Sequence, residues 1–324
     1  MAIKDKLLDF LRSGEYVSGE DLSERLKVSR TAIWKSVNSL REQGYEIDSV
    51  TNRGYRLVTC PDILTPGEIS RGLGTHLLGT RIFCFDSVDS TNEEAKRQAL
   101  AGAPDGSVFV SERQTGGKGR LGRNWSSPPG TGLWFSVLLR PGQIPACVSA
   151  TTLLAGCAVR SAIRELTDSP AMIKWPNDIV IGSQKVCGIL TEMSAEMERV
   201  EFVVVGIGVN VNNAQFPEEL KKKATSLFLK SGKSIQRAAL LREILRRFEK
   251  LLAENRSGLS AAFLGEYKKS CVTLGRNVSF ERDGVRLSGK AVGVSSEGEL
   301  VVALPDGPLT TVYSGEVSVQ GIYE

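Results

Sequence analysis

The sequence predicts an α+β protein of several domains: an N-terminal winged helix-turn-helix, a central α/β region, and a small C-terminal β-barrel of SH3-like size. Residues 1–60 show three helical segments and then a hairpin pattern, while later segments mix long helical patterns with apolar runs. Short strands with tight turns begin near Cys271. The 324 residues exceed one ordinary domain, so we expect domains at 1–62, 66–270 and 271–324.

The N-terminal prediction depends on helix-capping and turn residues. Apolar residues recur at helical spacing through Leu11, and Ser18 is suited to cap a second helix whose early turns are acidic. A third helix is predicted from about Arg30 to Glu42, and Gly44 ends it. Two β-like runs around Asn52-Arg53-Gly54 predict the wing.

The central region begins after a predicted linker at 59–68, which contains two prolines. Residues 148–166 predict a buried helix rich in small residues, and residues 234–255 predict a long amphipathic helix. Three apolar runs broken by turns predict neighbouring strands, at 172–181, 184–193 and 201–211.

Composition excludes several classes of protein. The chain is 41% hydrophobic and 24% charged, as in globular proteins, and no run approaches the roughly 20 apolar residues of a membrane span. The charged N-terminal pattern is not expected to be a signal peptide, and six cysteines without CxxC pairs predict reduced thiols in the cytoplasm. Since His76 is the single histidine, a structural zinc site and a Ser-His-Asp triad are not expected. The net charge of +4 is too mild to indicate a partner.

A glycine-rich stretch at 114–125 alternates four glycines with Lys118, Arg120 and Arg123. Glycines let backbone N–H groups approach a ligand, and the cations would neutralise phosphate or carboxylate. The stretch lacks the Walker pattern GxxxxGK[ST]. Taken alone, it is equally compatible with a flexible surface loop or a nonspecific anion patch.

A second stretch, Lys174-Trp-Pro-Asn-Asp178, supplies a cation, an amide and a carboxylate at one strand end, the mixture that a magnesium-nucleotide site needs. A plain strand followed by an Asx-Pro turn is the alternative. Lys185 begins the next apolar run and is predicted at the lip of the sheet.

The ordered motifs together resemble the biotin protein ligases, and with the winged helix the chain resembles the bifunctional biotin ligase and biotin operon repressors. The resemblance spans essentially the whole chain. The motifs are Ser90-Thr-Asn92, GGKGRLGRNW (116–125), SPPGTGLWFSVLLRP (127–141), KWPNDI (174–179), KVCGIL (185–190) and GIGVNV (206–211).

This resemblance implies a central ligase domain with a mixed sheet. It implies formation of biotinyl-5′-adenylate from biotin and ATP, with Mg²⁺ accompanying ATP, and transfer of biotin to a lysine of a biotin carboxyl carrier protein. It further implies binding to operator DNA as a homodimer when the adenylate is bound, with the adenylate as co-repressor of biotin-synthesis genes.

The resemblance also implies residue roles. Arg120 and Lys185 would be catalytic, and no fixed protein metal site is implied, with Mg²⁺ near Asp178. The implied biotin site comprises Ser90, Thr91, Asn92, Gln114, Gly117, Lys118, Gly119, Arg120, Lys185 and Gly188. The implied nucleotide site comprises Arg123, Trp125, Lys174, Asn177, Asp178 and Asn210, with residues 212–227 closing over the adenylate.

Two departures from the family pattern stand out. Lys118 stands where the family has an arginine. Lysine keeps the positive charge but lacks the planar guanidinium group that can donate two parallel hydrogen bonds. No tryptophan follows the adenylate loop; Phe228 and Leu227 are the available neighbours, so the adenine contact is unassigned.

The DNA-binding prediction depends on local charge. Segment 25–41 carries five Lys/Arg and no acidic residue, which concentrates positive charge on the turn and the third helix. A protein-binding winged helix is the alternative. The predicted DNA contacts are Ser29, Arg30, Thr31, Lys35 and Arg53.

Two other functions compete with this interpretation. A lipoate ligase would use the same adenylation chemistry, although the winged helix and KWPND argue against it. A ligand-sensing repressor without turnover is the other, although Arg120, Lys185 and Asp178 argue against it. No coiled coil is predicted in 1–60, so we expect dimerisation through the α/β region, beside 116–125 and 140–143.

Overall fold

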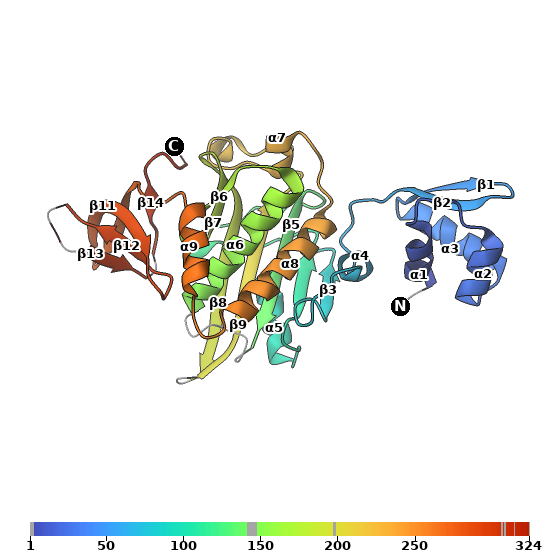
Figure 1. Cartoon of the computed structure of the whole chain (residues 1–324), viewed down its shortest axis with the longest axis horizontal. Helices are drawn as coiled ribbons and strands as arrows, with labels where there is room; N and C mark the ends of the chain where they lie inside the picture. The colour runs from blue at the N-terminus through green and yellow to red at the C-terminus, as the bar shows by residue number, and fades with distance from the viewer. Residues whose placement is uncertain are drawn as a thin grey trace. The chain divides into compact units, whose positions relative to one another are not determined.

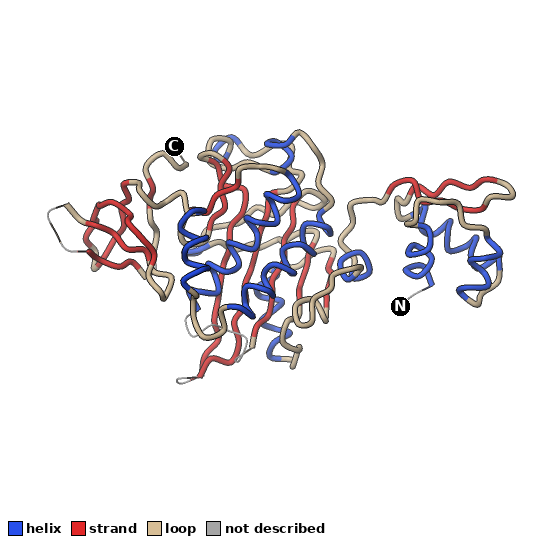
Figure 2. Tube along the Cα trace, in the orientation of Figure 1, coloured by secondary structure: helices blue, strands red, loops and turns tan. Residues whose placement is uncertain are grey.

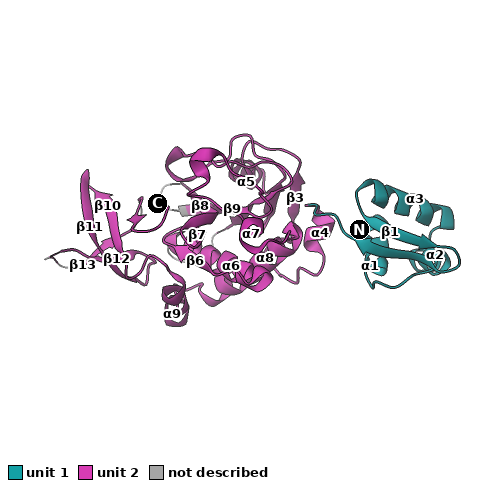
Figure 3. Ribbon diagram, turned by 90° about the horizontal axis from the view of Figure 1, so that it is seen from above, with its two compact units in different colours: residues 1–63 teal, residues 64–324 magenta. Residues whose placement is uncertain are grey.

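The chain forms two compact units, residues 1–63 and 64–324 (Figure 3). The computed structural model describes residues 3–140, 148–196, 199–305, 307, 309–313 and 315–323. Residues 141–143, which the dimer hypothesis invokes, lie outside the described residues. No helix in the described ranges is long and apolar enough to cross a membrane.

The first unit is a winged helix-turn-helix, as predicted (Figure 1). Ser18 and Ser29 cap the second and third helices by accepting bonds from the backbone N–H groups of Asp21 and Ala32. The third helix has the predicted bounds. The elements are α1 (Ile3–Leu11), α2 (Gly19–Leu26), α3 (Arg30–Glu42), and the antiparallel pair β1 (Glu46–Val50) and β2 (Gly54–Thr59).

The second unit is built on a seven-stranded mixed sheet of order β3-β4-β5-β9-β8-β7-β6, which confirms the implied fold class. Among the described strands of this sheet, β3 pairs with β4 in parallel and the other neighbours pair antiparallel. The strands are β3 (Ile82–Phe85), β4 (Val108–Ser111), β5 (Gly132–Leu139), β6 (Ala171–Lys174), β7 (Asp178–Ile181), β8 (Gln184–Glu196) and β9 (Arg199–Asn210).

Along β5 and β9, odd and even residues lie on opposite faces of the sheet, because successive side chains of a strand point to opposite sides. Odd residues such as Val205 and Ile207 join the main core, and this face is covered by α6 (Val148–Thr167) and α8 (Arg237–Glu254) (Figure 2). Even residues such as Val204 pack against α5 (Thr91–Leu100) in a separate cluster. The face of α5 is therefore the one on which the site described below is built.

Two sequence predictions need correction. The run 172–181 is two antiparallel strands, β6 and β7, because Lys174 pairs with Asp178 across a turn. The linker is shorter than expected: Leu64 is buried in the core, and α4 (Pro66–Ser70) begins after the cap Thr65. The long helices at 148–166 and 234–255 are confirmed as α6 and α8.

The C-terminal strands form a five-stranded antiparallel sheet of order β13-β12-β11-β10-β14. It follows α7 (Leu227–Ser231), α8 and α9 (Ala261–Ser270), and it belongs to the second compact unit. Its strands are β10 (Asn277–Arg282), β11 (Val285–Val294), β12 (Leu300–Ala303), β13 (Leu309–Val312) and β14 (Ser318–Val319).

Candidate active site

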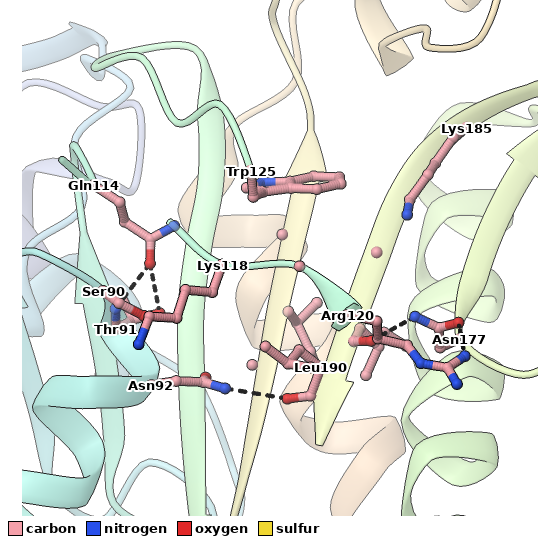
Figure 4. A pocket seen from close by; sticks show the side chains of 16 residues that line it. Ser90, Thr91, Asn92, Gln114, Lys118, Arg120, Trp125, Asn177, Lys185 and Leu190 are labelled. Atoms are coloured by element: carbon pink, nitrogen blue, oxygen red, sulfur yellow. Dashed lines mark hydrogen bonds between the residues drawn. The ribbon is translucent and has the colours of Figure 1, made fainter. Parts of the chain in front are cut away.

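A polar cluster at the start of α5 forms one end of a pocket (Figure 4). Oε1 of Gln114 accepts bonds from the backbone N–H and the hydroxyl of Thr91, at 2.8 and 3.1 Å. Asn92 donates to the carbonyl of Leu190 at 3.2 Å and accepts from the hydroxyl of Ser136 at 2.6 Å. These buried and half-buried groups are fixed donors and acceptors, as recognition of a neutral polar ring requires.

Two glycines of β9 let side chains approach the sheet. A Cβ at Gly206 would lie 2.2 Å from Oδ1 of Asn92, and one at Gly208 would lie 2.6 Å from Nε1 of Trp125. Both are even residues and so face the pocket. The GIGVN sequence thus alternates apolar residues for the core with glycines that make room for Asn92 and Trp125.

The glycine-rich loop folds back on itself as a small hairpin over the pocket. The N–H of Gly119 donates to the carbonyl of Arg123 at 2.6 Å, and the N–H of Trp125 donates to that of Gly117 at 2.8 Å. Its cations are held by partners from other elements. Lys118 pairs with Glu93 at 2.8 Å, and Arg123 pairs with Glu316.

Arg120 crosses from the loop to the far end of the pocket. It donates to Oδ1 of Asn177 at 3.1 Å and to the carbonyl of Gly315 at 2.9 Å. Burial lowers the pKa of its guanidinium, which nevertheless stays charged at neutral pH because arginine starts so high. Arg120 therefore supplies a partly desolvated positive charge facing the pocket.

Lys185 is the second cation of the pocket. Its Nζ lies 2.6 Å from Oδ1 of Asp178 and 5.1 Å from the centre of the Trp125 ring. Its backbone forms hydrogen bonds with the backbone of Lys223 and Thr225, in the loop that follows β9. The lysine is therefore held between a carboxylate and an aromatic face.

Most predicted site residues meet in this pocket. Those lining it are Ser90, Thr91, Asn92, Gln114, Lys118, Gly119, Arg120, Trp125, Asn177, Lys185 and Gly188, joined by Ile189, Leu190, Gly206, Ile207 and Gly208.

Five predicted residues lie outside the lining set: Gly117, Arg123, Lys174, Asp178 and Asn210. Gly117 and Arg123 form backbone hydrogen bonds within the loop hairpin, and Asp178 contacts the pocket residue Lys185.

Asn210 is buried and donates to the carbonyl of Thr225 at 3.1 Å. Nζ of Lys174 points to the C-terminal sheet, where it donates to the carbonyl of Val317 at 3.1 Å, and burial lowers its pKa. Leu227, one available adenine neighbour, is fully buried in the core.

Sequence reasoning missed four groups around the pocket. Ser136 and Glu192 both form hydrogen bonds with Asn92. They occupy even positions on β5 and β8, and this alternation in the sequence could have indicated that they face the pocket. Glu93 follows the Ser-Thr-Asn motif directly and pairs with Lys118. Tyr323, which contacts Asp178 from 145 residues away, carries no local signal.

The predicted DNA-contacting residues lie on α3, its cap and the wing. Ser29 caps α3; Arg30, Thr31 and Lys35 are exposed along it; and Arg53 lies over the ring of Tyr16 at 4.9 Å. Arg30 also pairs with Glu20 at 2.6 Å, in an exposed contact of small energy. Sequence reasoning missed Trp34, which is 55% exposed on the same helix.

Comparisons with known proteins agree with the architecture of each part. The "Biotin/lipoate A/B protein ligase family" matches residues 84–210, "HTH domain" matches 4–56, and "Biotin protein ligase C terminal domain" matches 273–320. The biotin protein ligase of Aquifex aeolicus, solved in complex with biotin and ATP, superposes with a TM-score of 0.66 at 34% identity. The match covers 74% of this chain and 99% of that one.

Two curated relatives extend the match to the full length. The "Bifunctional ligase/repressor BirA" of Bacillus subtilis (strain 168) is 38% identical, with 98% of both chains covered. The protein of the same name from Escherichia coli (strain K12) is 28% identical, with 97% of this chain and 96% of that one covered. The chain therefore belongs to the bifunctional ligase/repressor family, the biotin protein ligases that carry an N-terminal helix-turn-helix domain.

Proposed function

We propose that this chain activates biotin with ATP to form biotinyl-5′-adenylate and then transfers biotin to a lysine of a biotin carboxyl carrier protein. The observation that carries the proposal is a single pocket with buried hydrogen-bonding groups at one end and two cations, Arg120 and Lys185, at the other. A neutral ring and an anionic tail would each find a complementary end.

The pocket's polar end would hold the ureido ring of biotin. Thr91, Asn92 and Gln114 offer both donors and acceptors there. In the proposal the biotin site comprises Ser90, Thr91, Asn92, Gln114, Gly117, Lys118, Gly119, Arg120, Lys185 and Gly188, and the nucleotide site comprises Arg123, Trp125, Lys174, Asn177, Asp178 and Asn210.

The cations would act on the reacting end. When the carboxylate of biotin attacks the α-phosphorus of ATP, a bond forms between the carboxylate oxygen and phosphorus, and pyrophosphate leaves with the electron pair. The main barrier is repulsion between the two anions, and Arg120 and Lys185 would reduce it without reorganising. The amine of the carrier lysine then attacks the acyl carbon, AMP leaves, and the amine proton is lost.

Mg²⁺ fits this site as an ion carried by ATP. Among the described residues, no three acidic, cysteine or histidine side chains come together as ligands. Both carboxylate oxygens of Asp178 are already engaged, by Lys185 and by Tyr323. The ion would therefore be held mainly by phosphate oxygens near Asp178, and it would supply charge neutralisation there.

The decisive experiment mixes the protein with ATP, Mg²⁺ and either biotin or lipoate, followed by mass spectrometry. We expect biotinyl-adenylate with biotin, no adduct with lipoate, and transfer to a carrier-protein fragment. Adduct with lipoate alone would identify a lipoate ligase instead. Adenylate formation without transfer to the fragment would refute the transfer half of the proposal.

We also propose that the first unit binds operator DNA and that biotinyl-adenylate promotes the binding by making the chain a dimer. A single winged helix covers one half-site, and two must lie about one helical turn apart, or a multiple of it, on a palindrome. Sedimentation and gel-shift titrations with and without biotin plus ATP test this coupling. An equally tight dimer and DNA binder without ligand would refute it.

Further parts of the proposal concern organisation and location. The domains would span 1–62, 66–270 and 271–324, since the helix-turn-helix, ligase and C-terminal families match within those bounds. We place the reaction in the cytoplasm because ATP is a substrate and because Cys84, Cys157, Cys187 and Cys271 are free thiols.

A further inference from the structure

We infer that Tyr323 is a positioning residue for adenylation: its hydroxyl fixes the carboxylate of Asp178, which in turn holds the ammonium of Lys185 at the pocket. The inference rests on the proposed ligase function and adds to it a residue of the C-terminal segment. Tyr323 itself is outside the residues that line the pocket.

The contacts are a hydrogen bond followed by an ion pair. The hydroxyl of Tyr323 donates to Oδ2 of Asp178 at 2.7 Å, and Oδ1 of the same carboxylate lies 2.6 Å from Nζ of Lys185. The side chain of Asp178 is 11% exposed and that of Lys185 is 27% exposed. Because the carboxylate is largely shielded from water, its two protein partners determine which way it points.

Tyr323 can perform this task because its hydroxyl remains a donor. Burial, followed by the charge of Asp178, raises the pKa of the phenol, so it stays protonated throughout the neutral range. A deprotonated phenolate could not donate to a carboxylate and would repel it.

The backbone places Tyr323 in this position at a conformational cost. Its φ is +70°, in the left-handed region that favours glycine. The N–H of Tyr323 donates to the carbonyl of Ser183 at 3.0 Å, and Nζ of Lys174 lies over its ring at 5.0 Å. The conformation is thus held by contacts with the turn between β7 and β8 and with the last residue of β6.

Without the hydroxyl, Oδ2 of Asp178 loses its donor and the carboxylate is free to rotate. Lys185 then follows Asp178 and spends less time facing the reacting phosphate. The polar end of the pocket lies elsewhere, on α5 and Gln114. We therefore expect Tyr323→Phe to lower kcat for adenylation about tenfold while leaving KM for biotin within about twofold.

The test measures biotin-dependent ATP–pyrophosphate exchange by the full chain, comparing wild type, Tyr323→Phe and the control Tyr313→Phe. Tyr313 is 63% exposed beside β13, so its variant should match wild type. A wild-type protein without exchange would refute the proposed ligase function. An active wild type with an equally active Tyr323→Phe would overturn only the inference.

A double-variant cycle separates positioning from a general structural effect. If Tyr323 acts through Asp178, Tyr323→Phe should add less than twofold loss to Asp178→Asn. Losses that multiply in the double variant would overturn the inference. Should Tyr323→Phe fail to fold, Asp178→Asn by itself must show the tenfold loss in kcat, and full activity of that variant would overturn it.

Discussion

The ammonium of Lys118 lies 2.8 Å from Oε1 of Glu93, so an ion pair joins the glycine-rich loop to the first turn of α5. Lys118 is the position where the family's arginine is replaced, and Glu93 follows directly after the Ser-Thr-Asn motif. The pair therefore links the part of the loop above the pocket with the polar end of that pocket.

Glu93→Gln should loosen this loop. A partly exposed ion pair contributes about 0.2–1 kcal/mol, so we expect bound biotinyl-adenylate to dissociate roughly 1.4- to fivefold faster. Hydrogen exchange at residues 116–125 should rise as well. Glu266→Gln is the control, because it removes a Glu–Lys pair of 2.6 Å on α9. Unchanged exchange in the loop would show that Glu93 does not restrain it.

The same pair has a defined pH dependence. The hydrogen bond from Lys118 lowers the pKa of the Glu93 carboxyl group. The ion pair therefore stabilises the loop fully at pH values above the ordinary carboxyl range, and this stabilisation is lost as the pH falls through the lowered pKa. Retention of the adenylate should therefore show no Glu93 titration between about pH 6 and 9.

Lys185→Gln should cripple adenylation and leave the fold intact. Removing one donor that faces developing negative charge costs about 2.7–4 kcal/mol in comparable sites, or roughly a hundred- to a thousandfold in kcat. Pyrophosphate release measures the effect, and circular dichroism checks the fold. The control is Lys250→Gln, on a lysine whose side chain is 75% exposed on α8. Near-normal release from folded Lys185→Gln would rule out this role.

Arg120→Gly should let the adenylate escape. The substitution removes a charge at the pocket and two bonds that tie the loop to Asn177 and Gly315. Escaped adenylate would acylate lysines of bystander proteins, and labelling in a protein mixture measures this. Arg81→Gly, in an exposed bend, is the control. Bystander labelling no higher than that of wild type would mean that Arg120 does not retain the intermediate.

Arg30→Ala and Lys35→Ala should weaken operator binding without slowing biotin transfer, because both side chains are exposed on α3 in the separate first unit. Each lost phosphate contact should reduce the slope of log affinity against log salt by about one. Gel shifts at several salt concentrations measure this slope, with Lys6→Ala on α1 for comparison. Unchanged operator affinity in both variants would refute the assigned DNA-binding surface.

Local features of the sequence predicted their parts of the structure well. The bounds of α3 follow from Ser29 and from the helical pattern, both readable within a few residues. The pocket residues of α5, the glycine loop and β8 were predicted through ordered motifs that resemble a family.

Long-range placement could not be predicted in the same way. Lys174 and Asp178 belong to one motif, yet the side chain of Lys174 bonds to Val317, because the C-terminal sheet lies against that end of β6. The contact of Tyr323 with Asp178 depends on how the last strands fold onto the ligase sheet, and no local pattern encodes that.

Odd and even residues of β9 face opposite sides of the sheet, so this strand is sensitive to insertions and deletions. A one-residue deletion between Val203 and Asn210 would exchange the two faces of the strand on one side of the change. Valines would then enter the pocket, and Gly206 and Gly208 would leave cavities beneath α6 and α8. Related proteins should therefore vary in the identity of the odd residues of this strand and keep the number of residues fixed.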